Sequence, residues 1–559
     1  MSLSTSPSDI RRSPLLCRPS TFLVFAALLG AGLALLPVLA LAYKALSPQA
    51  ASIWPHLAAN VLPAALIDTG LLLLGVGTLC AIIGVGTAWL VTQFEFPGRR
   101  GLEWLLVLPL ALPTYITAYV YVEILGFQGP LQGALRALTG WRSLRDYWFP
   151  DPRSLPGAIC IMAIVLYPYV YLSVRALFGL QAAAIVESAR TLGAAPGRLF
   201  WRIGLPMARP ALAAGLTLAL LETLNDIGAS EYLGVRSLTL SIYTTWVNRN
   251  SLAGAAQIAC VMLMLVVLLI LVETHLRGQR RFALPVRQPR AVGRAPLSGW
   301  KAWIASLLCA LPVLFGAVLP IGFLAAEVLR RDLWQQFDGA MLRSLANALA
   351  FSGLAAGLVV LLGIGIAAAK RQGREPWLPA LSRLASLGYA VPGTVLALGL
   401  LVPLAAFDNA LANAARHWFG FNPGLLLIGS GAALVLAYVV RFLAIAISGM
   451  ESGLSRISPR IDDAARTLGA SAPQVMRKMH WPLARPAVAA AALLVFVDCL
   501  KELPATLLLR PLNVETLATT VYGHASRGQF EDGALAGLLI VLAGLYPAFR
   551  LARAGGRAG

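Results

Sequence analysis

The chain has 559 residues, of which 58% are hydrophobic and 13% are charged, and its formal net charge is +20. An ordinary soluble domain is about 45–50% apolar and about 25% charged, and a single soluble core stops growing near about 250–300 residues. The composition therefore excludes a soluble globular protein and favours a membrane protein. The basic residues fall between long apolar runs, which membrane topology explains and nucleic-acid binding does not.

Twelve apolar segments come close to the length of about 20 residues that a helix needs to cross a bilayer. The first follows three arginines, but its apolar stretch is too long for a typical signal peptide, so we expect it to remain as an anchor. The fifth and eleventh are short and end in acidic residues. The predicted spans are 21–43, 66–92, 104–126, 156–180, 207–222, 252–273, 302–328, 346–369, 381–405, 424–448, 484–500 and 534–552.

The distribution of positive charge predicts the orientation. If the amino terminus lies in the cytoplasm, most of the 45 Lys and Arg residues fall in cytoplasmic segments. Because cytoplasmic loops are enriched in Lys and Arg, we expect a multi-pass protein with both termini in the cytoplasm. The densest basic segment is a linker at 276–301, whose charge is explained by a solvated loop near anionic lipid.

The chain contains a repeat. The sequence RTLGA at 190–194 recurs 276 residues later at 466–470, and the segment 206–211 recurs in a close variant at 482–487. Each half holds six predicted spans, so the halves enter the membrane in the same sense and form parallel repeats. We expect an all-α polytopic protein with a pathway between its halves. The predicted parts are an N-terminal segment, a first half, the linker and a second half, at 1–20, 21–275, 276–301 and 302–559.

A loop after the fourth span of each half carries the most specific pattern. An acidic residue is followed by two small residues, then by a glycine four positions further on, and finally by a proline. The residues concerned are Glu187, Ser188, Ala189, Gly193, Leu205 and Pro206 in the first half, and Asp463, Ala464, Ala465, Gly469 and Pro482 in the second.

These residue types suit a short helix–turn–helix at the membrane surface. An acidic residue stabilises the start of a helix, and small side chains allow a partner to approach the backbone. Gly193 and Gly469 can adopt a positive φ and end that helix. Pro206 and Pro482 fit the first turn of the next helix. We therefore expect the acid of each copy to open a short helix.

The two loops resemble the EAA loop of ATP-binding-cassette importer permeases, which reads Glu-Ala-Ala, three residues, Gly, nine residues and Ile-x-Leu-Pro. The resemblance covers both halves and implies a type I, MetI-like permease fold. In that family the loop docks onto an ATPase subunit and passes ATP-driven closure to the spans. Ser188 and Asp463 depart from the family pattern, so the two docking sites are expected to differ.

The resemblance also implies partners and a location. We expect two copies of a cytoplasmic ATPase, a periplasmic substrate-binding protein and a bacterial inner membrane, with no nucleic acid. The sequence has no GxxxxGK[ST] phosphate loop. The chain is therefore expected to be a transport subunit and not an enzyme, and to bind no cofactor itself, with ATP and Mg²⁺ used by the partner ATPase.

Two further stretches narrow the substrate. ETLND at 222–226 is followed by TLSIY at 239–243, and KELPATLLLRP at 501–511 is followed by TLATTVY at 516–522. These stretches resemble ferric-iron importer permeases, which implies Fe³⁺ as the substrate and an iron-binding protein as its donor. Thiamine permeases share the fused layout and remain an alternative.

Four acidic residues lie at the predicted outer ends of the fifth and eleventh spans. Carboxylates are hard oxygen donors that suit a highly charged cation, and an ionisable residue at the edge of a span is a functional candidate. Alternatively, these residues are helix-end charges paired with Lys501 or Arg236. The candidate pathway residues are Glu222, Asp226, Asp498 and Glu502.

Two other classes of protein remain to be weighed. A secondary transporter could also have twelve spans in parallel halves, but it should lack paired EAA loops. A membrane-embedded enzyme would need a cluster of metal ligands or of acid–base residues. The six cysteines and five histidines are scattered through the sequence without metal-ligand spacing. Both classes are therefore disfavoured, and no metal site is assigned.

Overall fold

The structure is a computed structural model of the chain. It describes residues 21–143, 145–191, 195–277, 294–372, 375, 377–455 and 457–556. Three sequence predictions therefore fall wholly or mostly outside the described residues: the N-terminal segment 1–20, the glycine at 193 and most of the linker 276–301.

The described chain is almost entirely helical, as predicted. The α-helices are α1 (Thr21–Ala45), α2 (Pro48–His56), α3 (Leu62–Gln93), α4 (Arg99–Leu105), α5 (Thr114–Leu125), α6 (Pro130–Thr139), α7 (Leu155–Thr191), α8 (Pro196–Leu199), α9 (Leu205–Asn225), α10 (Ile227–Tyr232), α11 (Leu238–Val247), α12 (Leu252–Arg277), α13 (Trp300–Val313), α14 (Leu319–Arg330), α15 (Gly339–Gln372), α16 (Leu378–Ser386), α17 (Gly393–Phe419), α18 (Ala432–Ser455), α19 (Pro459–Thr467), α20 (Ala472–Val475), α21 (Trp481–Leu500), α22 (Pro504–Leu509), α23 (Leu517–Ser526) and α24 (Ala534–Gly556).

Shorter elements join these helices. The π turns are η1 (Leu57–Val61), η3 (Phe200–Gly204), η4 (Leu314–Val318) and η7 (Met476–His480), and the 3₁₀ turns are η2 (Leu108–Ala111), η5 (Leu333–Gln336), η6 (Leu387–Ala390) and η8 (Phe530–Gly533). Two-residue strands β1 (Phe94–Glu95) and β2 (Ala295–Pro296) pair in parallel, with Phe94 opposite Ala295. This pairing ties the residues just before α13 to the end of α3.

The chain forms two compact units, each built from segments far apart in the sequence. Unit 1 contains the chain up to Leu36 together with Gly353–Tyr389 and Tyr438–Phe496. Unit 2 contains Pro37–Ser352, Ala390–Ala437 and Val497–Gly559. The two EAA loops therefore fall in different units, the first in unit 2 and the second in unit 1.

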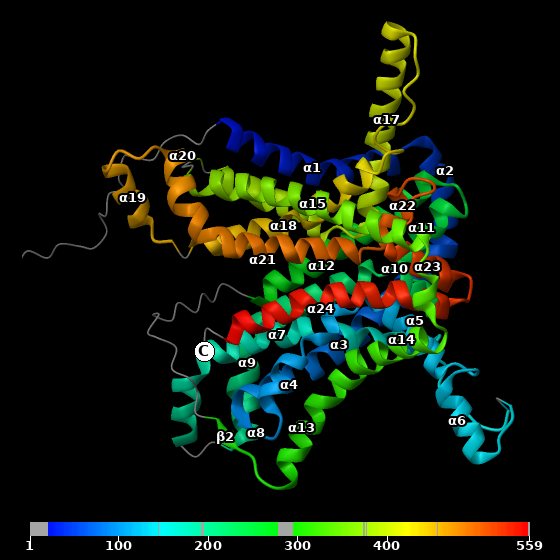
Figure 1. The fold of residues 1–559 in the computed structure, drawn as a ribbon, viewed down its shortest axis with the longest axis vertical. Helices are drawn as coiled ribbons and strands as arrows, with labels where there is room; N and C mark the ends of the chain where they lie inside the picture. The colour runs from blue at the N-terminus through cyan, green and yellow to red at the C-terminus, as the bar shows by residue number, and fades with distance from the viewer. Residues whose placement is uncertain are drawn as a thin grey trace, which may run out of the picture. The chain divides into compact units, whose positions relative to one another are not determined.

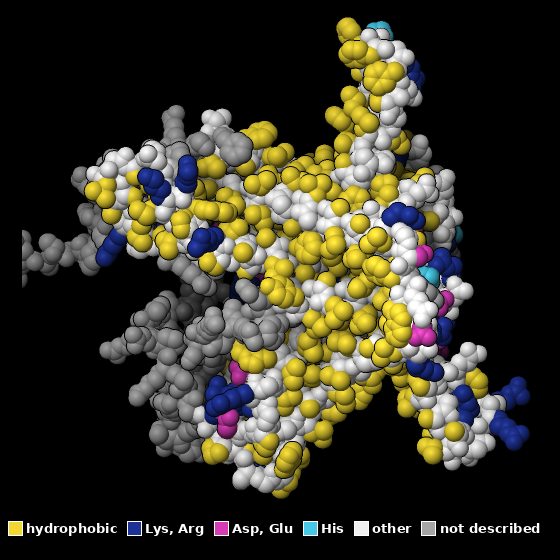
Figure 2. Space-filling view, in the orientation of Figure 1, with side chains coloured by type: hydrophobic (Ala, Val, Ile, Leu, Met, Phe, Trp, Pro, Cys, Tyr) yellow, Lys and Arg dark blue, Asp and Glu magenta, His cyan; other side chains and the backbone are white. Residues whose placement is uncertain are grey.

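The helices have the length and surface of membrane spans. The described residues contain ten helical runs that are long and apolar enough to cross a bilayer, or eleven if the bent pair Arg99–Ala111 and Thr114–Thr139 is one span. In Figure 2 the sides of α13, α14 and α24 carry mostly hydrophobic side chains. Leu74 is 70% exposed, as expected of a side chain that faces lipid. The polytopic prediction is confirmed, and the predicted span 534–552 falls on α24.

The third predicted span is not one straight helix. The sequence predicts an uninterrupted span at 104–126, but the chain bends by 94° between η2 and α5. Leu112 is extended, with φ −96° and ψ 128°, because a proline disfavours helical backbone at the residue before it. Pro113 therefore breaks the span. The ninth predicted span, 381–405, is similarly divided into α16 and α17, with Pro392 directly before α17.

Small residues let the spans of unit 2 pack closely. Helices α3, α7 and α9 contact one another and run alongside in Figure 1. A Cβ added to Gly215 of α9 would lie 2.7 Å from the Cα of Val170, and one added to Gly84 of α3 would lie 2.7 Å from the Cβ of the same valine. These distances are too short for a side chain. The glycines are required because membrane helices associate largely through close backbone packing.

Unit 1 is built around α15 and α18, with α1 and α21 packed against them. Ala27, Ile366 and Leu443 belong to one buried cluster, and Met450 and Val488 belong to a second. Figure 1 shows the four helices running in nearly the same direction. The second EAA loop follows α18 and leads into α21, so this bundle is the support on which the loop sits.

Candidate functional site

The second EAA loop has the predicted glycine turn. Gly469 follows α19 with φ +82°, a left-handed conformation that only glycine adopts routinely. The backbone N–H of Ala470 donates to the carbonyl of Ala465 over 3.0 Å, and that of Leu468 donates to Ala464 over 3.2 Å. These bonds close the helix end, as in the common glycine-terminated helix motifs. The prediction that Gly469 ends the short helix is confirmed.

The turn leaves a small, accessible surface. Asp463 and Ala464 are exposed and Ala465 is buried, so α19 lies against the protein through one face only. Leu468, which precedes the glycine, is 86% exposed. An apolar side chain presented in this way next to small residues can insert into a groove on a partner.

A buried polar network fixes α19 to the spans of unit 1. Oδ1 of Asp462 lies 2.7 Å from Nε2 of His480, the last residue of η7. Oδ2 of Asp462 accepts a hydrogen bond of 3.1 Å from Nε of Arg371, near the end of α15. The side chains of Asp462 and Arg371 are 15% and 16% exposed. One carboxylate therefore joins α19, η7 and α15.

Further bonds extend the network to α18. Arg371 also donates to the backbone carbonyls of Leu454 and Ile457, at the end of α18 and just before α19. Lys370 lies 2.8 Å from the carboxylate of Glu451. Charge-assisted hydrogen bonds are roughly twice as strong as neutral ones, so this end of unit 1 is held rigidly. Sequence reasoning missed these residues because their partners lie far apart in the chain.

Neither EAA loop begins as predicted, because Asp463 is the fifth residue of α19, which starts at Pro459, and the first loop departs further. Helix α7 continues without a break from Leu155 to Thr191, so Glu187 lies within a long helix and does not open a short one. The second copy is preceded by Ser458 and Pro459, and the proline keeps the serine out of the helical region. Residues 180–186, directly before Glu187, include neither glycine nor proline, so the helix has no such end signal there. The side chains of Glu187, Ser188 and Ala189 lie outside the described part of the chain.

Aromatic packing anchors the rest of the first loop. A Cβ added to Gly204 would lie 2.6 Å from the ring of Trp89 in α3. The Trp89 ring also meets Phe178 of α7 and Phe200 of η3, each at a centroid distance of 5.3 Å. The loop is thus packed against α3 and α7 through aromatic rings. Pro206 lies in the first turn of α9, as predicted.

At equivalent positions of the repeat, the two halves place the large and the small residue in opposite order. The repeat offset relates Trp89 to Gly365 and Gly204 to His480. The first half therefore has the aromatic ring of Trp89 on α3 against the glycine of its loop, whereas the second half has a glycine on the equivalent span and the larger residue in the loop. Both loops contain a π turn at the same repeat position, and such turns are frequent at functional sites.

Two of the four candidate pathway acids cap short helices. Asp226 accepts a hydrogen bond of 2.8 Å from the backbone N–H of Ala229 at the start of α10, and it also accepts a hydrogen bond from the hydroxyl of Thr114. Glu502 accepts bonds of 2.9 Å and 3.1 Å from the backbone N–H groups of Ala505 and Thr506 in α22. Both acids are buried. Each stabilises the helix that follows the break at the end of a long span.

The other two acids are placed one turn earlier. Asp498 forms an ion pair of 2.9 Å with Lys501, which matches the helix-end pairing considered from sequence. Glu222 is half-buried in α9. The role of all four acids in the translocation pathway stays a prediction, while the carboxylates of Asp226, Asp498 and Glu502 have structural partners.

Substitution at Asp226 separates capping from a role of its charge. Asp226→Ala removes the cap acceptor and is expected to destabilise the protein by about 0.5–2 kcal/mol and to lower uptake. Asp226→Asn keeps an acceptor oxygen without the charge and should behave nearly as wild type. Thermal unfolding and substrate uptake are measured for both. If the Asn variant is as stable as wild type but does not transport, the charge itself acts on the substrate.

The helices capped by these acids meet between the two halves of the sequence. A Cβ added to Gly228 of α10 would lie 2.8 Å from both Leu503, next to α22, and the Cβ of Tyr115 in α5, and 3.1 Å from the hydroxyl of Tyr119. No side chain fits there. Within unit 2, α10 is therefore packed closely against α5 and the residue before α22.

Comparison with known proteins identifies the architecture. The family model for the binding-protein-dependent transport system inner membrane component matches residues 80–281 and again 360–557. Each match includes one of the EAA loops. The chain belongs to this family. It is therefore a multi-pass permease of an inner membrane, a transport subunit that works with a substrate-binding protein and an ATPase.

Relatives of this permease are known by name. It is 26% identical over 499 residues to the Fe(3+)-transport system permease protein FbpB 2 of Haemophilus influenzae, a match that covers 87% of this chain and 89% of the relative. It is 26% identical to the probable ABC transporter permease protein y4fN of Sinorhizobium fredii, covering 84% and 83%. The molybdenum transport permease ModB of Escherichia coli is 29% identical over 200 residues, covering 34% of this chain and 83% of ModB.

Proposed function

We propose that this permease moves ferric iron from a periplasmic binding protein into the cytoplasm, driven by two copies of a separate ATPase subunit. The observation that carries the proposal is the match along nearly the whole chain to a permease named for Fe³⁺ transport. The match to ModB covers about a third of this chain and so supports the permease architecture more than a substrate. ATP and Mg²⁺ belong to the ATPase partner, and this chain supplies the path and the coupling surface.

The two EAA loops are the coupling surface in this proposal. The contacts of the second loop support a route by which movement of the ATPase is transmitted to the membrane-spanning helices. Leu468 and the small residues of α19 are accessible, while Asp462 joins α19 to α15 and to the start of α21 through Arg371 and His480. A displacement of α19 should therefore move α15 and α21 with it, because short hydrogen bonds join the three helices.

The orientation follows from the same assignment, with the EAA loops and both termini in the cytoplasm. A pair of cysteine variants tests it. Leu468→Cys and Trp148→Cys replace side chains of nearly equal exposure, 86% and 84%, one in the second loop and one in the segment between α6 and α7. In intact cells an impermeant maleimide should label only the cysteine at 148, and after permeabilisation it should label both. Labelling of 468 in intact cells would reverse the orientation.

The substrate is tested by uptake in cells that lack their own iron importers. Cells expressing the permease with its ATPase and binding protein should accumulate radioactive iron from ferric citrate. An excess of thiamine, molybdate or sulfate should not compete with this uptake. If thiamine abolished the uptake, or if the cells accumulated thiamine and not iron, the ferric proposal would be wrong while membership of the family would stand.

A further inference from the structure

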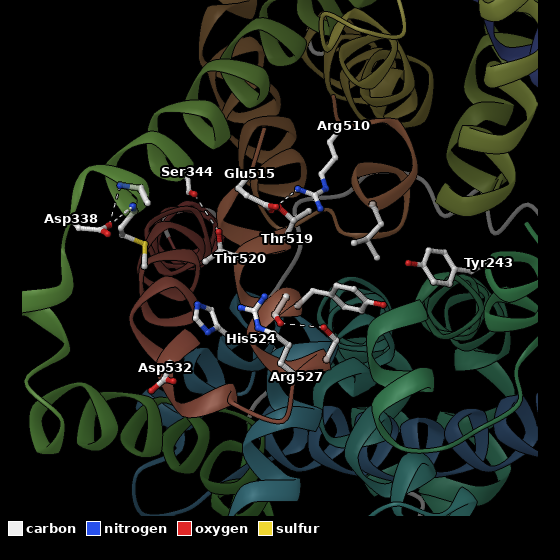
Figure 3. Close-up of a pocket in the computed structure, with 16 residues that line it drawn as sticks. Tyr243, Asp338, Ser344, Arg510, Glu515, Thr519, Thr520, His524, Arg527 and Asp532 are labelled. Atoms are coloured by element: carbon white, nitrogen blue, oxygen red, sulfur yellow. Dashed lines mark hydrogen bonds and ion pairs between the residues drawn. The ribbon is translucent and has the colours of Figure 1, made fainter. Parts of the chain in front are cut away.

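Two neighbouring cavities open at the end of unit 2 that lies opposite α8. The larger has a volume of about 730 Å³ and lies among α11, α15, α22 and α23 (Figure 3). The smaller has a volume of about 300 Å³ and lies against α5, α10 and α23. Tyr522 and Ser526 of α23 line both cavities. The cavities therefore meet at α23, and Gly228 of α10 lines the smaller one.

Three oxygen-bearing side chains converge at this meeting point. The hydroxyl of Tyr522 donates a hydrogen bond of 2.7 Å to Oε2 of Glu231 in α10. Tyr243 of α11 lines the larger cavity together with Tyr522, and Figure 3 shows its ring at the side of that cavity. All three residues are partly exposed. They come from three helices and from both halves of the sequence.

We propose that Glu231, Tyr243 and Tyr522 form a transit site for ferric iron at the entrance to the pathway, an inference that rests on the proposed function. Carboxylate and phenolate oxygens are hard donors, and hard cations prefer such ligands. Binding converts each coordinated phenol to a phenolate, and its proton passes to water, since ligands must be deprotonated to bind a metal. In the metal-free protein the phenolic proton of Tyr522 is held by the bond to Glu231.

The surroundings suit an iron ion that arrives with anionic ligands. Arg153 lies over the ring of Tyr232 at 4.8 Å from its centroid and lines the smaller cavity. Arg527 is exposed at the larger cavity. These guanidinium groups counter the charge of carboxylate or hydroxide ligands around the ion, and they discourage bare divalent cations. The site is thus selective for a chelated cation that can exchange its ligands for protein oxygens.

The place of the site explains why it would be transient. Next to it, α10 packs tightly against Leu503 and Tyr115 around Gly228. Tyr522 belongs to α23 of the second half, whereas Glu231 and Tyr243 belong to α10 and α11 of the first. Any movement that parts α10 from Leu503 also changes the distances among the three donors. Opening of the path therefore weakens the site and releases the ion inward.

Visible absorption tests the site, because a phenolate bound to ferric iron gives a charge-transfer band that free ferric citrate lacks. The purified full-length permease in lipid nanodiscs is titrated with ferric citrate. The wild type should develop the band, and Tyr522→Phe and Tyr243→Phe should reduce or abolish it. Glu231→Gln should weaken iron binding. Tyr147→Phe is the matched control, because Tyr147 is a half-exposed tyrosine bonded to Gln132 and not to a carboxylate.

The outcomes separate this site from the proposed function. If the wild type gives no band, or if the band persists in the two Phe variants at equal thermal stability, the transit site is wrong even where the complete importer takes up iron. If the complete wild-type importer does not take up iron, the proposed function fails. A band lost in the two Phe variants and kept in Tyr147→Phe supports the site.

Discussion

Replacing Gly469 by valine is expected to abolish ATP-driven uptake while the permease still folds and inserts. The glycine has φ +82°, and a Cβ built there meets no atom within 4 Å. A side chain at position 469 would therefore not clash with neighbouring atoms. The left-handed conformation costs an ordinary residue about 1–2 kcal/mol, and a β-branched residue is restricted further. The turn should change, and α19 should no longer present its surface in the coupled geometry. ATP-dependent uptake in proteoliposomes measures the loss.

Two substitutions control for other effects at this position. Gly469→Asn should keep most of the uptake, because asparagine tolerates the left-handed region better than other residues. Gly357→Val places the same side chain at an open position inside α15, where φ is not positive and no atom lies within 4 Å. It should transport as wild type. Normal uptake by the Gly469→Val variant would show that the turn does not couple the loop to the ATPase.

Removing the carboxylate of Asp462 is expected to loosen the second loop from its unit. Asp462→Ala leaves Arg371 and His480 without their shared partner. Hydrogen bonds to charged groups contribute about 1.5–3 kcal/mol, which corresponds to roughly a tenfold to hundredfold rise in the population of the opened loop. Amide hydrogen exchange should speed up by that factor across 459–480, and uptake should fall with it.

The adjacent acid supplies the control for this prediction. Asp463 is exposed, so Asp463→Ala should leave hydrogen exchange across 459–480 unchanged, whatever it does to contact with the ATPase. Equal acceleration in the two variants, or none in Asp462→Ala, would show that the network does not hold the loop. An Arg371→Ala variant should also speed up exchange, and the effect of the double variant should be smaller than the sum of the two, because both changes remove the bond between Arg371 and Asp462.

Much of the fold could be predicted because its signals are local. Apolar length identified the spans, and the repeated spacing around Gly469 placed the turn. Pro113 is a sequence signal for the bend before α5. The span at 104–126 was predicted from hydrophobicity alone, and hydrophobicity does not register a proline break. The continuity of α7 through Glu187 was missed because the motif was assumed to have the same form in both halves. The second copy has Ser458–Pro459 in front of it and the first does not.

The anchoring contacts could not be predicted because they join residues that no sequence period relates. Arg371 and Asp462 are 91 positions apart, and Trp89 meets Gly204 from a different span. A charge or an aromatic residue near the end of a span has many ordinary explanations. The capping role of Asp226 was more accessible, since an aspartate directly before a short helix is a common start signal. Because Asp226 also lies at the edge of a predicted span, its charge was interpreted as a pathway feature and its capping role was missed.

The difference between the two anchors has a consequence for coupling. The first loop is held by aromatic packing around Trp89, which is weakly sensitive to salt. The second is held by charges centred on Asp462, whose side chain is only 15% exposed, so that salt screens these charges much less than it screens exposed pairs. The two loops are thus held by different kinds of contact, although each carries the same motif.

The most direct test of the whole account is the energy requirement of transport by the purified chain. Proteoliposomes containing the permease, its ATPase and its binding protein should accumulate iron only when ATP and Mg²⁺ reach the ATPase. Proteoliposomes containing the permease alone should accumulate none under any proton or sodium gradient. Gradient-driven uptake by the chain alone would contradict the account and make the protein a secondary transporter.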